Sequence, residues 1–177
     1  MHPLVKEVAD DIARVRAELT RIVETTPRAK FDHAPRNGGW TGTGIIQHLG
    51  TVEGMATKML EGLFAKALAE GLAMERSTAS WLGSLDKYNV LDRSTRINAP
   101  ERAHPAADSK LETSWASLQA VRQRLHATVA TVDGRDLSAL SAPHPVFGAL
   151  NGYQWILVIG RHEERHISQL RETLSEA

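Results

Sequence analysis

The segment RHEERHISQL, residues 161–170, decides how the end of this chain folds. His162 and His166 are four residues apart, so on an α-helix they project from one face with their Cβ atoms about 5 to 6 Å apart. That face continues the apolar stripe formed by Trp155, Ile159 and Leu170. Both imidazoles should therefore point inward, where a polar ring needs a partner. Two such rings can share a divalent metal ion; the alternative is two core histidines bonded to carbonyl or carboxylate groups.

Helical periodicity also dominates the chain outside this segment. Apolar residues recur at steps of three and four in four stretches, residues 4–23, 42–72, 109–129 and 151–170, and no strand pattern separates them. The 177 residues are 42% hydrophobic, which is enough for one substantial core. We therefore predict an all-α, single-domain protein over residues 1–177, folded as a four-helix bundle.

Capping residues indicate where three of these helices begin. Thr41 is the expected N-cap of the second helix. Ser109 and Glu112 have the spacing of a capping box at the third, and Asn151 with Gln154 can cap the fourth.

The connections between the helices differ in length. Turn-rich residues 25–39 and 133–150 are short enough to join antiparallel neighbours. Residues 76–108 show no sustained period, and a connection of this length is unusual in a compact domain and often borders a functional site. We expect it to form a long crossover between helices 2 and 3.

Composition excludes several function classes. Lys+Arg and Asp+Glu both total 21, so a basic field that would attract nucleic acid is not expected. The chain has no apolar run of about 18 residues and no apolar leader at its start, which favours a cytoplasmic protein without a membrane partner. It has no cysteine, so thiol chemistry would require an external thiol.

His48 is the third candidate metal ligand, because it lies at the edge of the apolar stripe of the second helix beside Ile45 and Leu49. Three imidazoles leave at least one position open on a four- to six-coordinate ion, as in a catalytic site. Glu53 could orient a ligand or a bound water, although a solvated helix glutamate is the expected role. His144 could approach the open position or stabilise its turn.

Residues 162–166 also match H-E-x-x-H, the zincin motif in which the glutamate is a general base. The match is incomplete, because Gln169 and Glu172 stand where the metzincin extension carries glycine and histidine. Glu163 and His166 also form one Glu-x-x-His step of the ferritin-like di-iron type, but a second such step is missing from the sequence. We therefore favour neither site.

Other tryptophan, arginine and histidine residues are expected to have structural roles or none at the site. Trp40, Trp81 and Trp115 should belong to the core rather than line a pocket mouth. The long side chains of Arg161 and Arg165 should extend to solvent. The remaining histidines form no visible constellation: His2, His33, His104 and His126.

The order of these motifs resembles the DinB/YfiT-like superfamily. The likeness spans nearly the whole chain and rests on Trp40-Thr41 ahead of His48-Leu49, on the HPVFG turn at residues 144–148, and on RHEERHISQL. The resemblance implies a four-helix bundle, often a homodimer, that binds one divalent ion such as zinc, nickel or iron through His48, His162 and His166.

The resemblance also suggests a function. Some members are transferases or isomerases that use low-molecular-weight thiols such as bacillithiol or mycothiol, so we expect a metal-dependent transferase acting on a small-molecule substrate. A metal ion can convert a thiol with a pKa of about 8.5 into the reactive thiolate. A metal-dependent hydrolase and a non-catalytic metal-binding protein with a structural or sensing role are the alternatives.

Overall fold

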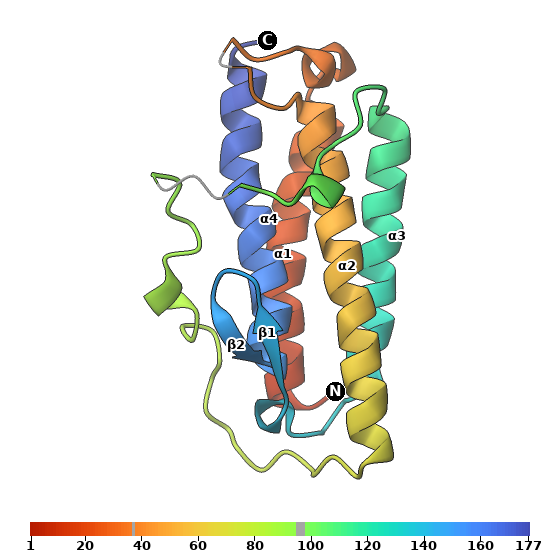
Figure 1. Cartoon of the computed structure of the whole chain (residues 1–177), viewed down its shortest axis with the longest axis vertical. Coiled ribbons are helices and arrows are strands. Elements are labelled where there is room, and N and C mark those ends of the chain that lie inside the picture. The colour runs from red at the N-terminus through yellow and green to blue at the C-terminus, as the bar shows by residue number, and fades with distance from the viewer. Residues whose placement is uncertain (37, 95–97) are drawn as a thin grey trace.

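The computed structural model describes residues 1–36, 38–94 and 98–177. Its four long helices are α1 (Pro3–Thr25), α2 (Gly42–Ala69), α3 (Leu111–Ala130) and α4 (Gly152–Ser175), arranged side by side as a bundle (Figure 1). The predicted all-α four-helix bundle is confirmed. Within the described ranges, none of these helices is long and apolar enough to cross a membrane.

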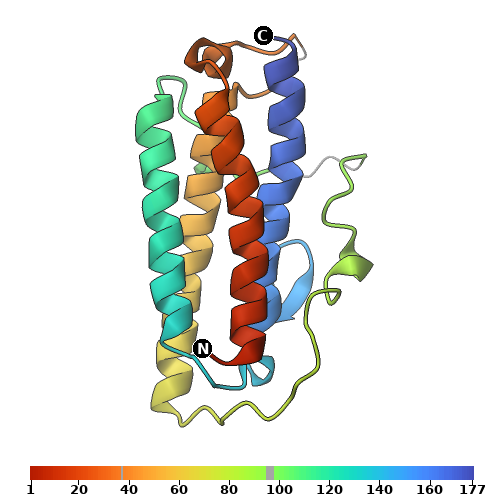
Figure 2. The same cartoon turned by 180° about the vertical axis from the view of Figure 1, so that it is seen from behind.

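The chain changes direction along the bundle in an up-down-down-up order. α1 and α4 run upward in Figure 1, whereas α2 and α3 both run downward, and Figure 2 shows the same order from behind. The predicted long crossover returns the chain to the upper end of the bundle between α2 and α3. The two short connections join antiparallel helices, as predicted (Figure 1). The prediction that these helices are neighbours is wrong for the backbone contacts, because α1 packs mainly against α4, and α2 packs against α3 and α4.

Local capping fixes two of the predicted helix starts. The Thr41 side chain accepts a hydrogen bond from the Gly44 backbone N–H at 3.0 Å. Asn151 and Gln154 form a complete capping box at the start of α4.

The predicted capping box at the third helix is wrong. α3 begins at Leu111 after Lys110, and no side chain caps it. The reason is local, because the Ser109 N–H bonds to the Ala106 carbonyl and Ser109 belongs to the preceding turn.

A short β-hairpin before α4 corrects the expectation that no strands occur. β1 (Ser141–His144) pairs antiparallel with β2 (Gly148–Asn151), and the HPVFG motif forms its closed end. Each strand has four residues, too few to show a period-two pattern in the sequence. Gly148 has a φ of 74°, a left-handed conformation that glycine adopts without steric cost. The hairpin is held to α4 by a 3.0 Å bond from the Trp155 indole N–H to the Ala142 carbonyl.

The core consists of two apolar clusters stacked along the bundle. The lower cluster includes Ile12, Leu60, Leu125 and Ile156, and the upper cluster includes Leu19, Leu49, Leu118 and Ile167. On each of the four helices the boundary between the two clusters falls near the middle of the helix. Polar side chains occupy that level, and they form the candidate site and a charged cluster beside it.

Candidate metal centre

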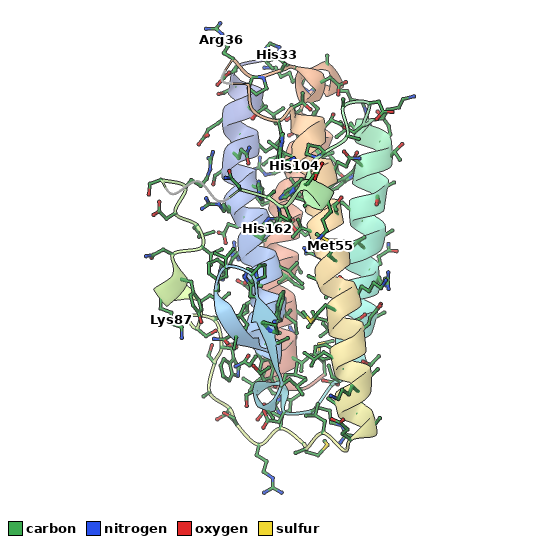
Figure 3. All side chains as sticks on the ribbon, in the orientation of Figure 1. His33, Arg36, Met55, Lys87, His104 and His162 are labelled. Carbon is green, nitrogen blue, oxygen red and sulfur yellow. The ribbon has the colours of Figure 1, made fainter. Side chains whose placement is uncertain are left out.

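Three histidine side chains meet at the middle of the bundle. His48 comes from α2, and His162 and His166 come from successive turns of α4; Figure 3 labels His162 at this level. One ring nitrogen from each lies within 4.8 Å of the other two. The Nε2 atoms of His48 and His162 are 3.3 Å apart. The structure thus brings together all three candidate ligands.

The spacing of these nitrogens suits a metal ion. Two nitrogens bound at about 2.0 to 2.1 Å to one tetrahedral zinc ion would be roughly 3.3 to 3.4 Å apart. The 3.3 Å between Nε2 of His48 and Nε2 of His162 agrees with this separation.

Hydrogen bonds fix which nitrogen of two rings remains available. The Nδ1–H of His48 donates to the carbonyl of Ala103 at 2.7 Å, and the Nδ1–H of His166 donates to Oε1 of Gln169 at 2.8 Å. In a neutral imidazole the other nitrogen then carries a lone pair. Both Nε2 atoms are therefore prepared to accept a metal ion, as in proteins where such outer partners orient histidine ligands.

Burial and the neighbouring groups favour the neutral form of all three rings. Burial lowers the pKa of His48, although its bond to Ala103 partly offsets this effect. Burial, together with the neighbouring imidazoles, holds the pKa of His162 well below its ordinary range. Burial and the charge of His48 lower the pKa of His166 to about 3. Neutral imidazole is the form that binds metals, so the donor set fits a divalent cation.

The upper wall of the centre is aromatic. The Trp40 ring lies 4.6 Å from the His48 ring and 6.5 Å from the His166 ring, measured between centroids. The His104 ring lies 5.9 Å from that of Trp40. Trp40 packs against the upper core as expected, but it also lines the site.

The sequence did not indicate that Ala103 and His104 border the site, where the Ala103 carbonyl accepts from His48 and the His104 ring packs against Trp40. They belong to η3 (Glu101–Ala103) and the residue after it, within the crossover. The absence of a periodic pattern there left no signal for their position; the length of the crossover was the one indication that it borders a site.

Glu53 and Glu163 lie in a buried charged cluster with Arg16 and Arg122. Arg16 binds Glu163 at 2.8 Å and Glu53 at 2.9 Å, and Arg122 binds Glu53 at 2.6 Å and Glu163 at 2.5 Å. Glu53 is 4% exposed and Glu163 is 1% exposed. We call these four residues the charged quartet.

The quartet corrects the expectation for Glu53, which is neither solvated nor a partner of the histidines. It also argues against the general-base role that the H-E-x-x-H motif gives to its glutamate. The carboxylate of Glu163 is engaged by two guanidinium groups on the interior side of α4. It is therefore unsuited to act as a general base.

The two arginines expected in solvent are instead anchored. Arg161 contacts Asp11 at 3.0 Å and Glu164 at 2.8 Å. Arg165 donates to the Val90 carbonyl at 3.1 Å and also to the Asp92 carbonyl. The tie of Arg165 to the crossover corrects the prediction and holds that segment against α4.

His144 lies at the closed end of the hairpin. Its Nδ1 accepts hydrogen bonds from the backbone N–H groups of Val146 at 3.2 Å and Phe147 at 3.3 Å. This geometry matches the turn-stabilising role. Its ring also lies 5.0 Å from that of Trp155 on α4 and 4.6 Å from that of Phe147.

Comparison with known proteins agrees with this architecture. The chain is 29% identical over 150 residues to the uncharacterized protein YuaE of Bacillus subtilis strain 168. The aligned region covers 81% of this chain and 82% of YuaE. The crystal structure of TT2238, a four-helix bundle protein, superposes with a TM-score of 0.64 at 21% identity, covering 95% of this chain and 98% of TT2238. The family model of the DinB superfamily matches residues 11–170. The chain belongs to the DinB superfamily.

Proposed function

We propose that this protein binds one divalent metal ion through Nε2 of His48, His162 and His166 and uses it in a transfer reaction on small molecules. The observation that carries the proposal is the convergence of three imidazole nitrogens within 4.8 Å, with two of the rings oriented by Nδ1–H hydrogen bonds. Three protein ligands leave a position for an exogenous group, which distinguishes a reactive site from a closed structural one. Zinc, nickel and iron all accept such a donor set.

The reaction that we propose uses a low-molecular-weight thiol as the nucleophile. The bound ion would supply Lewis acidity and favour the thiolate over the thiol. The thiol proton goes to solvent, the sulfur forms a bond to an electrophilic carbon, and the leaving group departs with its bonding electron pair. The chain itself contains no cysteine, so the sulfur must come from the cosubstrate.

Metal content is the first test. Untagged protein from metal-replete medium should contain about one ion per chain by elemental analysis, and His48→Ala, His162→Ala and His166→Ala should lose it. His33→Ala is the matched control, because His33 is exposed and precedes α2. A metal-free wild type would refute the proposal. Retention by His48→Ala alone would show that the ligand set is wrong.

Activity assays then separate the possible uses of the metal. Metal-dependent consumption of electrophiles by one member of a thiol panel supports the transferase, whereas turnover of esters or amides without thiol supports the hydrolase. If metal removal changes the melting temperature and no substrate is consumed, the ion stabilises the fold. The homodimer stays a prediction, which sedimentation analysis would test.

A further inference from the structure

A short piece of the crossover, residues 99–106, is bound to the first turns of α2 beside the three histidines. Ala103 is fully buried in this piece, and its carbonyl accepts the Nδ1–H of His48 at 2.7 Å. Figure 3 labels the next residue, His104, beside α2. A neutral imidazole with its proton on Nδ1 keeps its lone pair on Nε2. The position of the Ala103 carbonyl therefore decides which nitrogen of His48 can bind a metal ion.

Gln47 holds the same piece of the crossover from the preceding position on α2. Its side-chain Oε1 accepts the backbone N–H of Ala106 at 2.7 Å. Gln47 and His48 are thus successive residues of one helix that bind crossover residues three apart. Two bonds restrain the orientation of this piece relative to α2, whereas a single bond would let it pivot.

The backbone between the two bonds is stiff and closely packed. The Ala103 N–H donates to the Pro100 carbonyl at 2.8 Å, which closes the η3 turn. Pro105 has a fixed φ because of its ring. This ring packs on Gly44, where an added Cβ would lie 3.2 Å from Cγ of Pro105. A displacement of Ala106 would therefore move Ala103 as well, because the residues between them have little freedom to compensate.

We propose that Gln47 is a positioning residue of the metal centre, which holds Ala106 so that the Ala103 carbonyl stays on Nδ1 of His48 and the lone pair stays on Nε2. This inference rests on the proposed metal binding and adds an outer residue to it. Without this hold the His48 ring can also carry its proton on Nε2. That tautomer must lose the proton from Nε2 before this nitrogen can bind a metal ion.

The tautomer of His48 in the metal-free, full-length protein is the first readout, because a purely structural role of Gln47 would not change it. ¹⁵N-labelled histidine distinguishes protonated from unprotonated ring nitrogens, and at about pH 8 an ordinary histidine is neutral. The wild type should carry the proton on Nδ1. Gln47→Leu removes the acceptor and should give a mixture of both tautomers. Gln47→Glu keeps an oxygen acceptor and should retain the wild-type tautomer.

Zinc affinity, measured by chelator competition, is the second readout. Gln47→Leu should bind zinc about 2- to 10-fold more weakly, the range expected for one net hydrogen bond. Gln47→Glu should bind zinc no more weakly than the wild type. Thr51→Ala is the matched control, because Thr51 lies one turn further along α2 and its hydroxyl bonds to the backbone carbonyl of Gln47 at 3.1 Å. This control should match the wild type in both readouts.

The outcomes separate this inference from the metal centre. A wild-type tautomer in Gln47→Leu would overturn the inference, even if the melting temperature fell, because Gln47 would then only fasten the crossover. If Gln47→Leu does not fold, Gln47→Met repeats the test with a side chain of similar length that lacks the oxygen. Absence of zinc uptake by the wild type would refute the metal centre, and the tautomer measurement would still decide whether Gln47 orients His48.

Discussion

The charged quartet gives the sharpest prediction about stability. Glu163→Gln keeps the shape of the side chain but removes one of two negative charges that balance Arg16 and Arg122. Glu163 is 1% exposed and accepts from Arg16 at 2.8 Å and from Arg122 at 2.5 Å. Breaking a buried ion pair in this way costs about 3 to 5 kcal/mol, because the remaining charge is desolvated and unbalanced. For a chain of this size that corresponds to a melting temperature lower by about 6 to 20 °C.

The measurement is urea and thermal unfolding of the metal-free protein, so that metal binding does not contribute to stability. Glu164→Gln is the matched control, because Glu164 is the next residue on α4 and its partner Arg161 is bound at a partly exposed site. The control should lose less than about 1 kcal/mol. Equal losses for the two variants would refute the quartet as the dominant polar interaction of the core. A stable Glu163→Gln protein that had lost only activity would instead restore the general-base interpretation.

Three further predictions concern the outer partner of a ligand, helix packing and pH. Gln169→Leu should weaken metal binding by about 10- to 100-fold in chelator competition, because the Nδ1–H of His166 loses its acceptor; unchanged affinity would contradict this. Gly160→Ala should destabilise the protein by about 1 to 3 kcal/mol, because the new Cβ would lie 2.9 Å from Cγ2 of Ile12 across the α1–α4 contact. Gly62→Ala, with no atom within 4 Å of its Cβ, should instead stabilise by up to about 1 kcal/mol, and the same chemical unfolding assay separates the two. The pKa of His166 is about 3 in the folded state against an ordinary 6.5. Between these two pH values the unfolded chain binds a proton at His166 that the folded chain does not bind. The stability of the metal-free protein should therefore decrease as the pH falls from 6.5 toward 3, and a flat profile between pH 6.5 and 5 would contradict this.

The histidine positions show how far local pattern reaches. His162 and His166 share one helical face by spacing alone, and His48 follows from its place beside the apolar stripe of α2. The structure adds that these faces meet, with nitrogens within 4.8 Å. The hydrogen-bond partners of the rings are likewise of two kinds, one local in the sequence and one distant. Gln169 lies on the same helix as His166, whereas the carbonyl that orients His48 belongs to Ala103, 55 residues away in the crossover.

The sequence-based predictions were wrong for polar side chains whose partners are distant in the sequence. Glu53 reads as a solvated helix residue until Arg16 of α1 and Arg122 of α3 are brought beside it. Arg165 reads as a surface side chain until the Val90 carbonyl caps it. The hairpin escaped detection because strands of four residues carry too little period to distinguish them from a turn.

By itself the sequence determined four helices, their buried faces, the histidine spacing and the DinB resemblance, because helical periodicity and capping depend on residues within one or two turns of each other. Only the tertiary structure decided that Glu163 of the H-E-x-x-H motif faces the arginines of the quartet, that the crossover supplies the outer partner of His48, and that the hairpin packs His144 against Trp155. These outcomes depend on which distant segments meet. Periodicity shows that a face is buried, but it does not contain the identity of the group that the face will contact.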